Sequence, residues 1–317
     1  MTKNKIKLSV IVLFYFGESW IKECIQSLEK QSLSRSDYEI ILVDNGGSTP
    51  SVDNYEGVPN TKILHYHINH GFAGGNNKAL AHAQGEFILL MNQDVVVHFN
   101  CLEELVTAFE HSPRAGVVSA NMLMISYNDH PNRHASAHKI VGLYKLTRLG
   151  YASYFTRETD ENSIPVEFVS GNAMCFRKCM LNDVENYLFD ARLKSYAEDL
   201  DLSIRLKKTK WEMYVCPKAV VYHYRDKAFS GSPLDQFRKL THISSNRLWV
   251  YYNNLSWPKF LIRLPAFLLG IPSKVSRPDG DSKFHLGNFL VAFALTPFIF
   301  IYFGFRVLKH QKAPKQF

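Results

Sequence analysis

The sequence predicts an α/β protein with a mainly parallel sheet covered by helices on both faces. Short apolar runs rich in Val, Ile, Leu and aromatic residues alternate with helical patterns through the first half of the chain. This alternation requires crossover connections, which place helices on both faces of a parallel sheet. Because ligands bind at the carboxyl ends of the strands in such sheets, polar residues that follow the apolar runs are candidates for a functional site.

The expected elements can be placed in order along the chain. The first apolar run follows KNKIK and imitates a secretory signal, but GESWIKEC after it contains no small-residue cleavage site, so we interpret it as a strand. The predicted strands are 7–15, 38–45, 62–68, 86–92, 115–123, 211–216 and 219–223. Predicted helices lie between the first two strands, where Ile21, Cys24, Ile25 and Leu28 share one face, and at 71–84, 99–111 and from Glu198 onward.

Positive charge is concentrated at the C-terminal end of the sequence. The chain has 317 residues and a formal charge of +8, with a sequence pI near 9.1. Residues 258–317 contain nine Lys or Arg and two Asp, so this segment carries +7 of the +8. Since these cations accompany an apolar tail, we expect them to meet anionic lipid headgroups, and we expect no nucleic-acid partner.

The tail also contains an uncharged, mostly apolar run at residues 286–305. About 20 apolar residues are enough to cross a bilayer as a helix, although Pro297 would kink it. A hairpin in the membrane interface and an ordinary amphipathic core helix are the alternatives. We therefore expect residues 1–230 to form the α/β domain and residues 231–317 to form a helical, membrane-associating region. Five scattered cysteines, an odd number, indicate reduced thiols and a cytoplasmic location on the inner leaflet.

Polar residues follow two of the predicted strands. YEIILVDN ends in Asp44 and Asn45, and EFILLMNQD ends in Asn92 and Asp94. Both carboxylates are expected at the same edge of the sheet, where a fold of this kind assembles a site. The alternative is that Asp and Asn simply favour the turns after strands.

A stretch with three glycines, Gly71, Gly74 and Gly75, lies where the helix at 71–84 begins. Glycines at a helix N-terminus can let a diphosphate approach backbone N–H groups. The pattern matches neither G-x-G-x-x-G nor G-x-x-x-x-G-K-[ST], which disfavours a dinucleotide enzyme or a P-loop ATPase.

The second half adds acidic and basic candidates. Glu198 and Asp199 open a helical pattern, where acidic residues often serve only as partners of the helix dipole. They point in different directions from the helix axis, so one can cap the helix while the other faces a cleft. His223 ends a predicted strand with Arg225 and Lys227 nearby, a combination that suits a metal or phosphate site better than a lone His does.

Seven stretches in this order resemble the family-2 glycosyltransferases, which have the GT-A fold with a Rossmann-like sheet. The chain is most similar to the rhamnosyltransferase-like branch of bacterial surface-polysaccharide synthesis, and the resemblance covers about Lys7 to Ser230. The stretches are SVIVLFYFGES, ILVDNGGST, NHGFAGGNNKAL, ILLMNQDVVV, FVSGNAM, YAEDLDLSIRLKKTKW and YVCPKAVVYHYRDKAFS.

The resemblance implies roles for particular residues. The Asp that contacts the nucleotide base corresponds to Asp44, and the last Asp of D-x-D, a metal ligand, corresponds to Asp94. Asn92 replaces the first Asp of D-x-D, which leaves Asp94 as the metal ligand. The catalytic base of the E-D stretch corresponds to Asp199, and a later metal or diphosphate contact corresponds to His223. Further donor-binding candidates are Asn45, Gly71, Asn76, Asn92, Arg225 and Lys227.

The implied function is inverting transfer of a sugar from a UDP- or dTDP-sugar to a glycan or lipid-linked acceptor. Mg²⁺ or Mn²⁺ is the expected cofactor, because these ions need only one or two protein carboxylates beside the substrate phosphates. Glu198 is the second candidate for the base. The expected location is the cytoplasmic face of the inner membrane.

Two rival functions are weaker. A catalytically inactive, membrane-associated protein that binds nucleotide sugars would have lost the base or the metal ligand, yet Asp94, Asp199 and His223 are present. A nucleotidyltransferase would need a basic, Gly-rich phosphate loop after the first strand, and FYFGES has none.

Overall fold

The computed structural model describes residues 6–15, 18–47, 50–125, 140–146, 152–224, 233–265 and 286–310. These residues belong to two compact units. The first unit contains the described residues up to Lys145 and those from Tyr154 to Tyr224. The second contains the described residues from Pro233 onward, together with residues 146, 152 and 153. The predicted boundary at residues 230/231 lies outside the described residues and stays a prediction.

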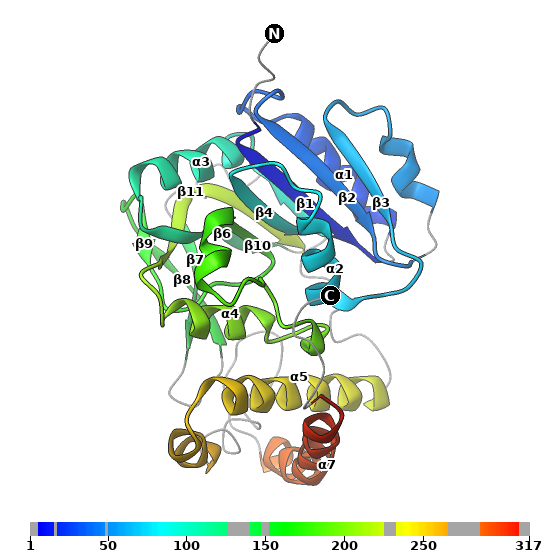
Figure 1. Ribbon diagram of the computed structural model, residues 1–317, viewed down its shortest axis with the longest axis vertical. Helices are drawn as coiled ribbons and strands as arrows, with labels where there is room; N and C mark the ends of the chain where they lie inside the picture. Colours follow the sequence, from blue (N-terminus) through cyan, green and yellow to red (C-terminus); the bar gives the residue numbers. More distant parts are fainter. Residues whose placement is uncertain are drawn as a thin grey trace. The chain divides into compact units, whose positions relative to one another are not determined.

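A nine-stranded mixed sheet forms the centre of the first unit in the described part of the chain (Figure 1). The strands lie in the order β3-β2-β1-β4-β10-β6-β11-β5, and β9 pairs with β11; β7 and β8 form a separate two-stranded sheet. Their bounds are β1 Leu8–Phe14, β2 Tyr38–Asp44, β3 Thr61–His65, β4 Phe87–Asn92, β5 Val95–Val97, β6 Ala115–Ile125, β7 Ile140–Leu146, β8 Ala152–Glu158, β9 Ile164–Pro165, β10 Ala173–Arg177 and β11 Glu212–Tyr224.

Strand directions place one set of strand ends at a common edge. Strands β1 to β4 pair in parallel, as do β6 and β11. β10 was not predicted, and it lies antiparallel between β4 and β6. The prediction of a mainly parallel sheet therefore holds for β1 to β4 and for β6 with β11, whereas β10, β5 and β9 pair antiparallel with their neighbours. Since β10 opposes both neighbours, β4 and β6 run the same way, and all the parallel strands end at one edge.

Two cores cover the sheet, as predicted. Alternate residues of β1 enter different cores: Val10 and Val12 pack with α1 and α3, whereas Ile11 and Leu13 pack with α2 and α4. Figure 1 shows these two helix pairs on opposite faces of the sheet. The helices are α1 Glu18–Glu29, α2 Gly71–Leu80, α3 Cys101–His111 and α4 Glu198–Leu206.

The two strands predicted at 211–216 and 219–223 are one strand, β11. Pro217 lies inside it, and the pairing register with β6 shifts between Cys216 and Val220. Three residues of β11, Pro217 to Ala219, have no register partner on β6, so this irregularity interrupts the pairing without ending the strand. It explains why the sequence around Pro217 predicts two strands.

The described residues of the second unit from Pro233 onward are mainly helical. It contains α5 (Pro233–Asn254), a helical stretch at residues 257–265 and α7 (Leu286–His310). Phe237 of α5 and Phe298 of α7 stack edge to face with ring centroids 5.4 Å apart. Within the described residues, none of the helices has the length and apolarity required to cross a membrane. The membrane association of residues 231–317 stays a prediction.

Candidate active site

Four of the predicted site residues lie at the edge where the parallel strands end: Asp44, Asn92, Asp94 and His223. Asp44 and Asn92 are the last residues of β2 and β4, and both strands flank β1. His223 is the penultimate residue of β11, opposite Val95 of β5. The turn between β4 and β5 carries Asp94, so the antiparallel pairing of β5 with β11 brings Asp94 beside His223.

Asp94 Oδ1 lies 3.3 Å from His223 Nε2. Both atoms are buried, and neither has a hydrogen-bond partner among the described residues. The backbone fixes the pair, since Tyr224 N donates to Asp94 O at 3.1 Å. On its other side, His223 Nδ1 faces the Met124 sulfur at 3.4 Å. A carboxylate oxygen and an imidazole nitrogen are therefore held close together without a full set of hydrogen bonds.

This pair fits a divalent cation. Oxygen or nitrogen ligands at about 2.1 Å in octahedral geometry lie about 3 Å from each other. The observed separation of 3.3 Å is close to that value. In the part of the chain that the structure describes, no group of three or more His, Cys, Asp or Glu side chains could hold an ion. Mg²⁺ and Mn²⁺ complete their coordination with water and substrate phosphates, so two protein ligands suffice.

Asp44 is buried and oriented by its neighbours. Its Oδ1 accepts a hydrogen bond from Gly47 N at 2.9 Å, and its Oδ2 lies 3.6 Å from His65 Nδ1. His65 is directly opposite Asp44 in the β2–β3 ladder, and its Nε2 contacts Asp53 at 3.1 Å. The carboxylate thus keeps one defined orientation at the sheet edge. Sequence reasoning missed His65, because only the strand register places it beside Asp44.

Asn45 and Gly71 organise the turn that leads into α2. Asn45 Nδ2 donates to Asn69 Oδ1 and to Gly71 O at 3.2 Å each, and its Oδ1 accepts from His70 N at 3.2 Å. Gly71 has φ +71°, and a Cβ there would lie 2.6 Å from Lys194 O. Within the described residues, the absence of a side chain at Gly71 therefore allows the backbone of Lys194 to lie close to it. The predicted donor contacts of both residues stay predictions.

Asn76, on α2, is buried with one unsatisfied atom. Its Nδ2 donates to Phe72 O at 2.9 Å, while its Oδ1 has no hydrogen-bond partner among the described residues. The same holds for one buried carboxyl oxygen of Glu198. With Asp94 and His223, four predicted site residues carry such an atom. Each unmet buried polar atom costs about 1–3 kcal/mol, so their concentration among these residues favours a ligand site.

Glu198 and Asp199 differ in environment although they are adjacent. Glu198 is buried, and its burial together with the nearby Asp199 carboxylate raises the pKa of Glu198 well above its usual range. Asp199 is partly exposed, with Oδ1 accepting from Leu200 N at 2.8 Å and Oδ2 from Gly171 N at 3.4 Å. Burial disfavours the charged, proton-accepting form of Glu198, whereas Asp199 reaches solvent. Asp199 is therefore better suited than Glu198 to accept a proton.

Gly171 and Asn172 connect Asp199 of α4 to Asn92 at the end of β4. Gly171 N donates to Asp199, while Asn92 N donates to Asn172 O and Asn92 Nδ2 donates to Asn172 Oδ1, each at 3.2 Å. Asn172 Nδ2 also faces the Met122 sulfur at 3.7 Å. These residues precede β10 and lie in the FVSGNAM stretch, to which the sequence assigned no role. The only sequence signal that these residues belong to the site was the position of FVSGNAM among the seven motifs of the resemblance.

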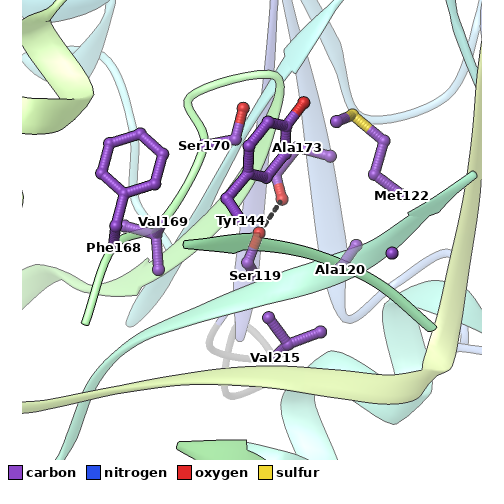
Figure 2. Close-up of a pocket in the computed structure, with 10 residues that line it drawn as sticks. Ser119, Ala120, Met122, Tyr144, Phe168, Val169, Ser170, Ala173 and Val215 are labelled. Atoms are coloured by element: carbon purple, nitrogen blue, oxygen red, sulfur yellow. Dashed lines mark hydrogen bonds between the residues drawn. The ribbon is translucent and has the colours of Figure 1, made fainter. Parts of the chain in front are cut away.

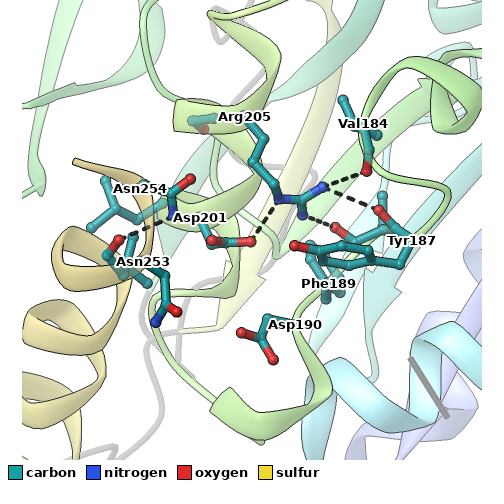
Figure 3. Close-up of polar contacts among 12 residues, drawn as sticks. Val184, Tyr187, Phe189, Asp190, Asp201, Arg205, Asn253 and Asn254 are labelled. Carbon is teal, nitrogen blue, oxygen red and sulfur yellow. Dashed lines mark hydrogen bonds and ion pairs between the residues drawn. The ribbon is translucent and has the colours of Figure 1, made fainter. Parts of the chain in front are cut away.

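A buried arginine anchors α4. Arg205 Nε donates to Asp201 Oδ2 at 2.8 Å, and its other nitrogens donate to the carbonyls of Val184, Tyr187 and Leu188 (Figure 3). The guanidinium also lies 4.2 Å from the centroid of the Tyr187 ring. Because its hydrogen bonds are to backbone carbonyls of the preceding loop or to Asp201 of the same helix, Arg205 holds α4, and thus Asp199, against that loop.

That loop in turn holds α2. Phe189 O accepts from Asn77 Nδ2 at 2.7 Å, and Lys194 O accepts from Ala73 N at 2.8 Å. Ser195 Oγ accepts from Phe72 N at 3.2 Å. The loop therefore links the helix that carries Asp199 to the helix that carries Asn76.

Neither of two surface hollows includes a predicted site residue. The first is a cavity of about 10 Å³ between β6 and the Phe168–Ser170 stretch, where Ser119 Oγ donates to Ala173 O (Figure 2). One water needs about that volume, so a sugar does not fit. The second, of about 420 Å³, includes Lys7 and Arg177 at the opposite edge of the sheet.

Arg225 and Lys227 lie outside the described residues, so their predicted contacts stay predictions.

Comparison with known families decides the classification. Residues 9–184, more than half of the chain, match the family described as glycosyl transferase family 2. This chain belongs to that family. The resemblance inferred from the seven motifs is thereby confirmed.

Two curated relatives of the family-2 chain are named as sugar transferases. Staphylococcus aureus TarS, a poly(ribitol-phosphate) beta-N-acetylglucosaminyltransferase, is 32% identical over 103 residues, which are 31% of this chain and 18% of TarS. The N-acetylglucosaminyl-diphospho-decaprenol L-rhamnosyltransferase of Mycobacterium tuberculosis is 23% identical over 240 residues, which are 69% of this chain and 76% of that protein. The match therefore spans less than a fifth of TarS.

Solved structures share the fold of this family-2 chain. GalNAc-T7 with UDP, GalNAc and Mn²⁺ matches with a TM-score of 0.66 and 15% identity over 98% of this chain and 59% of that chain. S. aureus TarS 1–349 in complex with UDP-GlcNAc matches with a TM-score of 0.56 and 20% identity over 90% of this chain and 79% of that chain. At these identities the likeness concerns the fold alone, and it agrees with the GT-A fold predicted from the motifs.

Proposed function

We propose that this chain transfers a sugar from a nucleoside-diphosphate sugar to a glycan or lipid-linked acceptor during cell-surface polysaccharide synthesis, with inversion at the anomeric carbon. Membership of glycosyl transferase family 2 supports the reaction class. The proposal rests mainly on the Asp94–His223 pair, whose facing atoms are 3.3 Å apart and lie at the edge where the parallel strands end.

The donor contacts follow from the sheet edge. Asp44 has lone pairs beyond those used by Gly47 and His65, and a carboxylate there can accept the imide N–H of either uracil or thymine. A UDP-sugar and dTDP-rhamnose are therefore the proposed donors. The names of the mycobacterial rhamnosyltransferase and of the TarS complex with UDP-GlcNAc support these two classes.

The leaving diphosphate gains negative charge when its bond to the sugar breaks. Mg²⁺ or Mn²⁺ bound by Asp94 and His223 would neutralise that charge. Asn92, tied to Asn172, lies beside this position and can orient a phosphate through its amide. Arg225 and Lys227 are proposed as further diphosphate contacts.

Asp199 is the proposed general base. It takes the proton of an acceptor hydroxyl, whose oxygen attacks the anomeric carbon on the face opposite the diphosphate; the carbon–oxygen bond to the diphosphate breaks, and its electrons leave with that group. General-base assistance of this kind contributes roughly 10²- to 10⁴-fold in rate. The hydrogen bonds from Leu200 N and Gly171 N orient the carboxylate for this role.

The cytoplasmic face of the inner membrane is the proposed location. Support comes from the basic, apolar C-terminal segment, which carries +7 of the formal charge of +8.

Product formation tests the proposal. Purified protein is incubated with Mn²⁺, UDP- or dTDP-sugars and a detergent extract of bacterial membranes, and release of nucleoside diphosphate is measured. We expect release with the wild type and a loss of at least 100-fold with Asp199→Asn, while Asp160→Asn, an exposed control, retains activity. Equal release by Asp199→Asn would contradict the assigned mechanism.

A further inference from the structure

Helix α7 exposes a continuous apolar face. Its side chains follow helical spacing and are 43–74% exposed. The face consists of Phe298, Ile301, Tyr302, Phe305 and Leu308. Single exposed apolar residues are common on protein surfaces, whereas a contiguous stripe of five marks an interaction site.

The side of α7 that packs on α5 contains a buried cation. Arg306 is 6% exposed, and its guanidinium donates to Asn246 of α5 and lies 5.2 Å from the centroid of the Trp249 ring. A helix that packs on a core in water normally buries its aromatic residues and exposes its arginine. Here Arg306 is buried and hydrogen-bonded, while Ile301, Phe305 and Leu308 are more than half exposed. The outward face is therefore built for an apolar surrounding.

The helical stretch at residues 257–265 adds a second exposed group of the same kind. Trp257, Leu261 and Ile262 are 62%, 55% and 76% exposed. Lys259 and Arg263 are exposed on the same stretch. Trp beside Lys and Arg is the composition of segments that lie at the boundary between headgroups and acyl chains.

Charge identifies the partner. The described part of the second unit contains seven Lys or Arg and one Asp: Arg238, Lys239, Arg247, Lys259, Arg263, Arg306 and Lys309 against Asp235. Two copies of such a surface would repel each other, whereas an anionic bilayer attracts it. The apolar side chains can insert between the acyl chains of the lipids, and the cations attract the anionic headgroups.

We propose that the apolar face of α7 docks in the plane of an anionic lipid surface, with the helix lying along the bilayer and not crossing it. Phe298, Ile301 and Phe305 enter the acyl boundary, and Arg306 remains in its hydrogen bond with Asn246. This inference does not depend on the sugar-transfer reaction.

Vesicle co-sedimentation of the full chain tests the docking. The probes are vesicles of phosphatidylcholine alone and vesicles that contain 30% phosphatidylglycerol. We expect the wild type to bind the anionic vesicles, more weakly at high salt, and Phe305→Asp to bind at least tenfold more weakly. Phe99→Asp is the matched control, since Phe99 is a 59% exposed phenylalanine of the first unit and the charge change is the same. If Phe305→Asp melts below the wild type, the pair Ile301→Ser and Leu308→Ser replaces it.

Several outcomes would overturn the proposal. The proposal is wrong if the wild type does not bind anionic vesicles. It is also wrong if Phe305→Asp or the serine double variant binds them as tightly as the wild type does. A lipid-free dimer that Phe305→Asp converts to a monomer, with vesicle binding unchanged, would reassign the face to a contact between copies. Transfer to a water-soluble acceptor should be equal in wild type and Phe305→Asp, which separates this test from that of the reaction.

Discussion

Asp94 Oδ1 and His223 Nε2 lie 3.3 Å apart although the two residues are distant in the sequence. Asp94 belongs to the turn between β4 and β5, and His223 belongs to the long strand β11. The short antiparallel pairing of β5 with β11 is what brings them together. This contact joins two residues that the motif resemblance assigned separately to metal binding.

Loss of the carboxylate should weaken cation binding. In Asp94→Ala, one of the two proposed ligands is gone, so we expect the affinity for Mn²⁺ in the presence of a nucleoside diphosphate to fall at least tenfold, which is about 1.4 kcal/mol. Isothermal titration calorimetry measures it, with Asp160→Ala as the exposed control. Unchanged Mn²⁺ affinity in Asp94→Ala would place the ion elsewhere.

Glu198 should make stability depend on pH. Burial raises its pKa in the folded state, so between the unfolded value near 4.5 and the folded value the native chain holds a proton that the unfolded chain has released. Stability therefore falls as pH rises through this window, by at most about 1.4 kcal/mol per pH unit. Glu198→Gln removes this slope and should be the more stable protein at pH 8. Thermal melts from pH 5 to 9 measure the difference, and parallel curves would count against a neutral Glu198.

Arg205 should matter far more for stability than an exposed arginine. Arg205→Met leaves Asp201 buried without its ion pair and leaves carbonyls of the preceding loop unpaired, which costs roughly 3–5 kcal/mol. Arg114 also pairs with a carboxylate, Glu212, but is 75% exposed, so Arg114→Met should cost at most about 1 kcal/mol. Urea unfolding compares the two. Similar losses would mean that Arg205 does not anchor α4.

Gly71 should tolerate no side chain. An alanine there would adopt φ +71° and place its Cβ 2.6 Å from Lys194 O, so we expect a loss of about 1–3 kcal/mol in the free energy of unfolding. Gly57→Ala is the control, because a Cβ at Gly57 meets nothing within 4 Å. That variant should change stability by at most about 0.5 kcal/mol. Equal effects of the two substitutions would remove the packing argument for Gly71.

The sequence was sufficient where a local pattern determined the structure. The apolar runs ending in Asp44 and Asn92 are strands β2 and β4, and the spacing of Ile21, Cys24, Ile25 and Leu28 marks the buried face of α1. Each of these patterns is contained within about ten residues, so strand and helix periodicity reveal it.

Long-range pairing was the part that the sequence did not reveal. The place of β10 between β4 and β6, the position of His65 opposite Asp44 and the contact of Asn92 with Asn172 all depend on strand register. If the register of a strand shifted by one residue, its side chains would turn to the other face of the sheet and these contacts would be lost. Likewise, the partner of Gly71 is Lys194, whose backbone arrives from a distant loop.

Donor binding tests the central claim most directly. The melting temperature of wild-type protein is measured with UDP-, dTDP-, GDP- and CMP-sugars, each with Mn²⁺ and again with EDTA. A ligand that binds only the folded state stabilises that state by RT ln(1 + [L]/Kd), and it thereby raises the melting temperature. The account predicts a Mn²⁺-dependent rise with a UDP- or dTDP-sugar that is lost in Asp94→Ala and kept in Asp160→Ala. A folded wild-type protein that no donor stabilises, or that responds equally in EDTA, would contradict it.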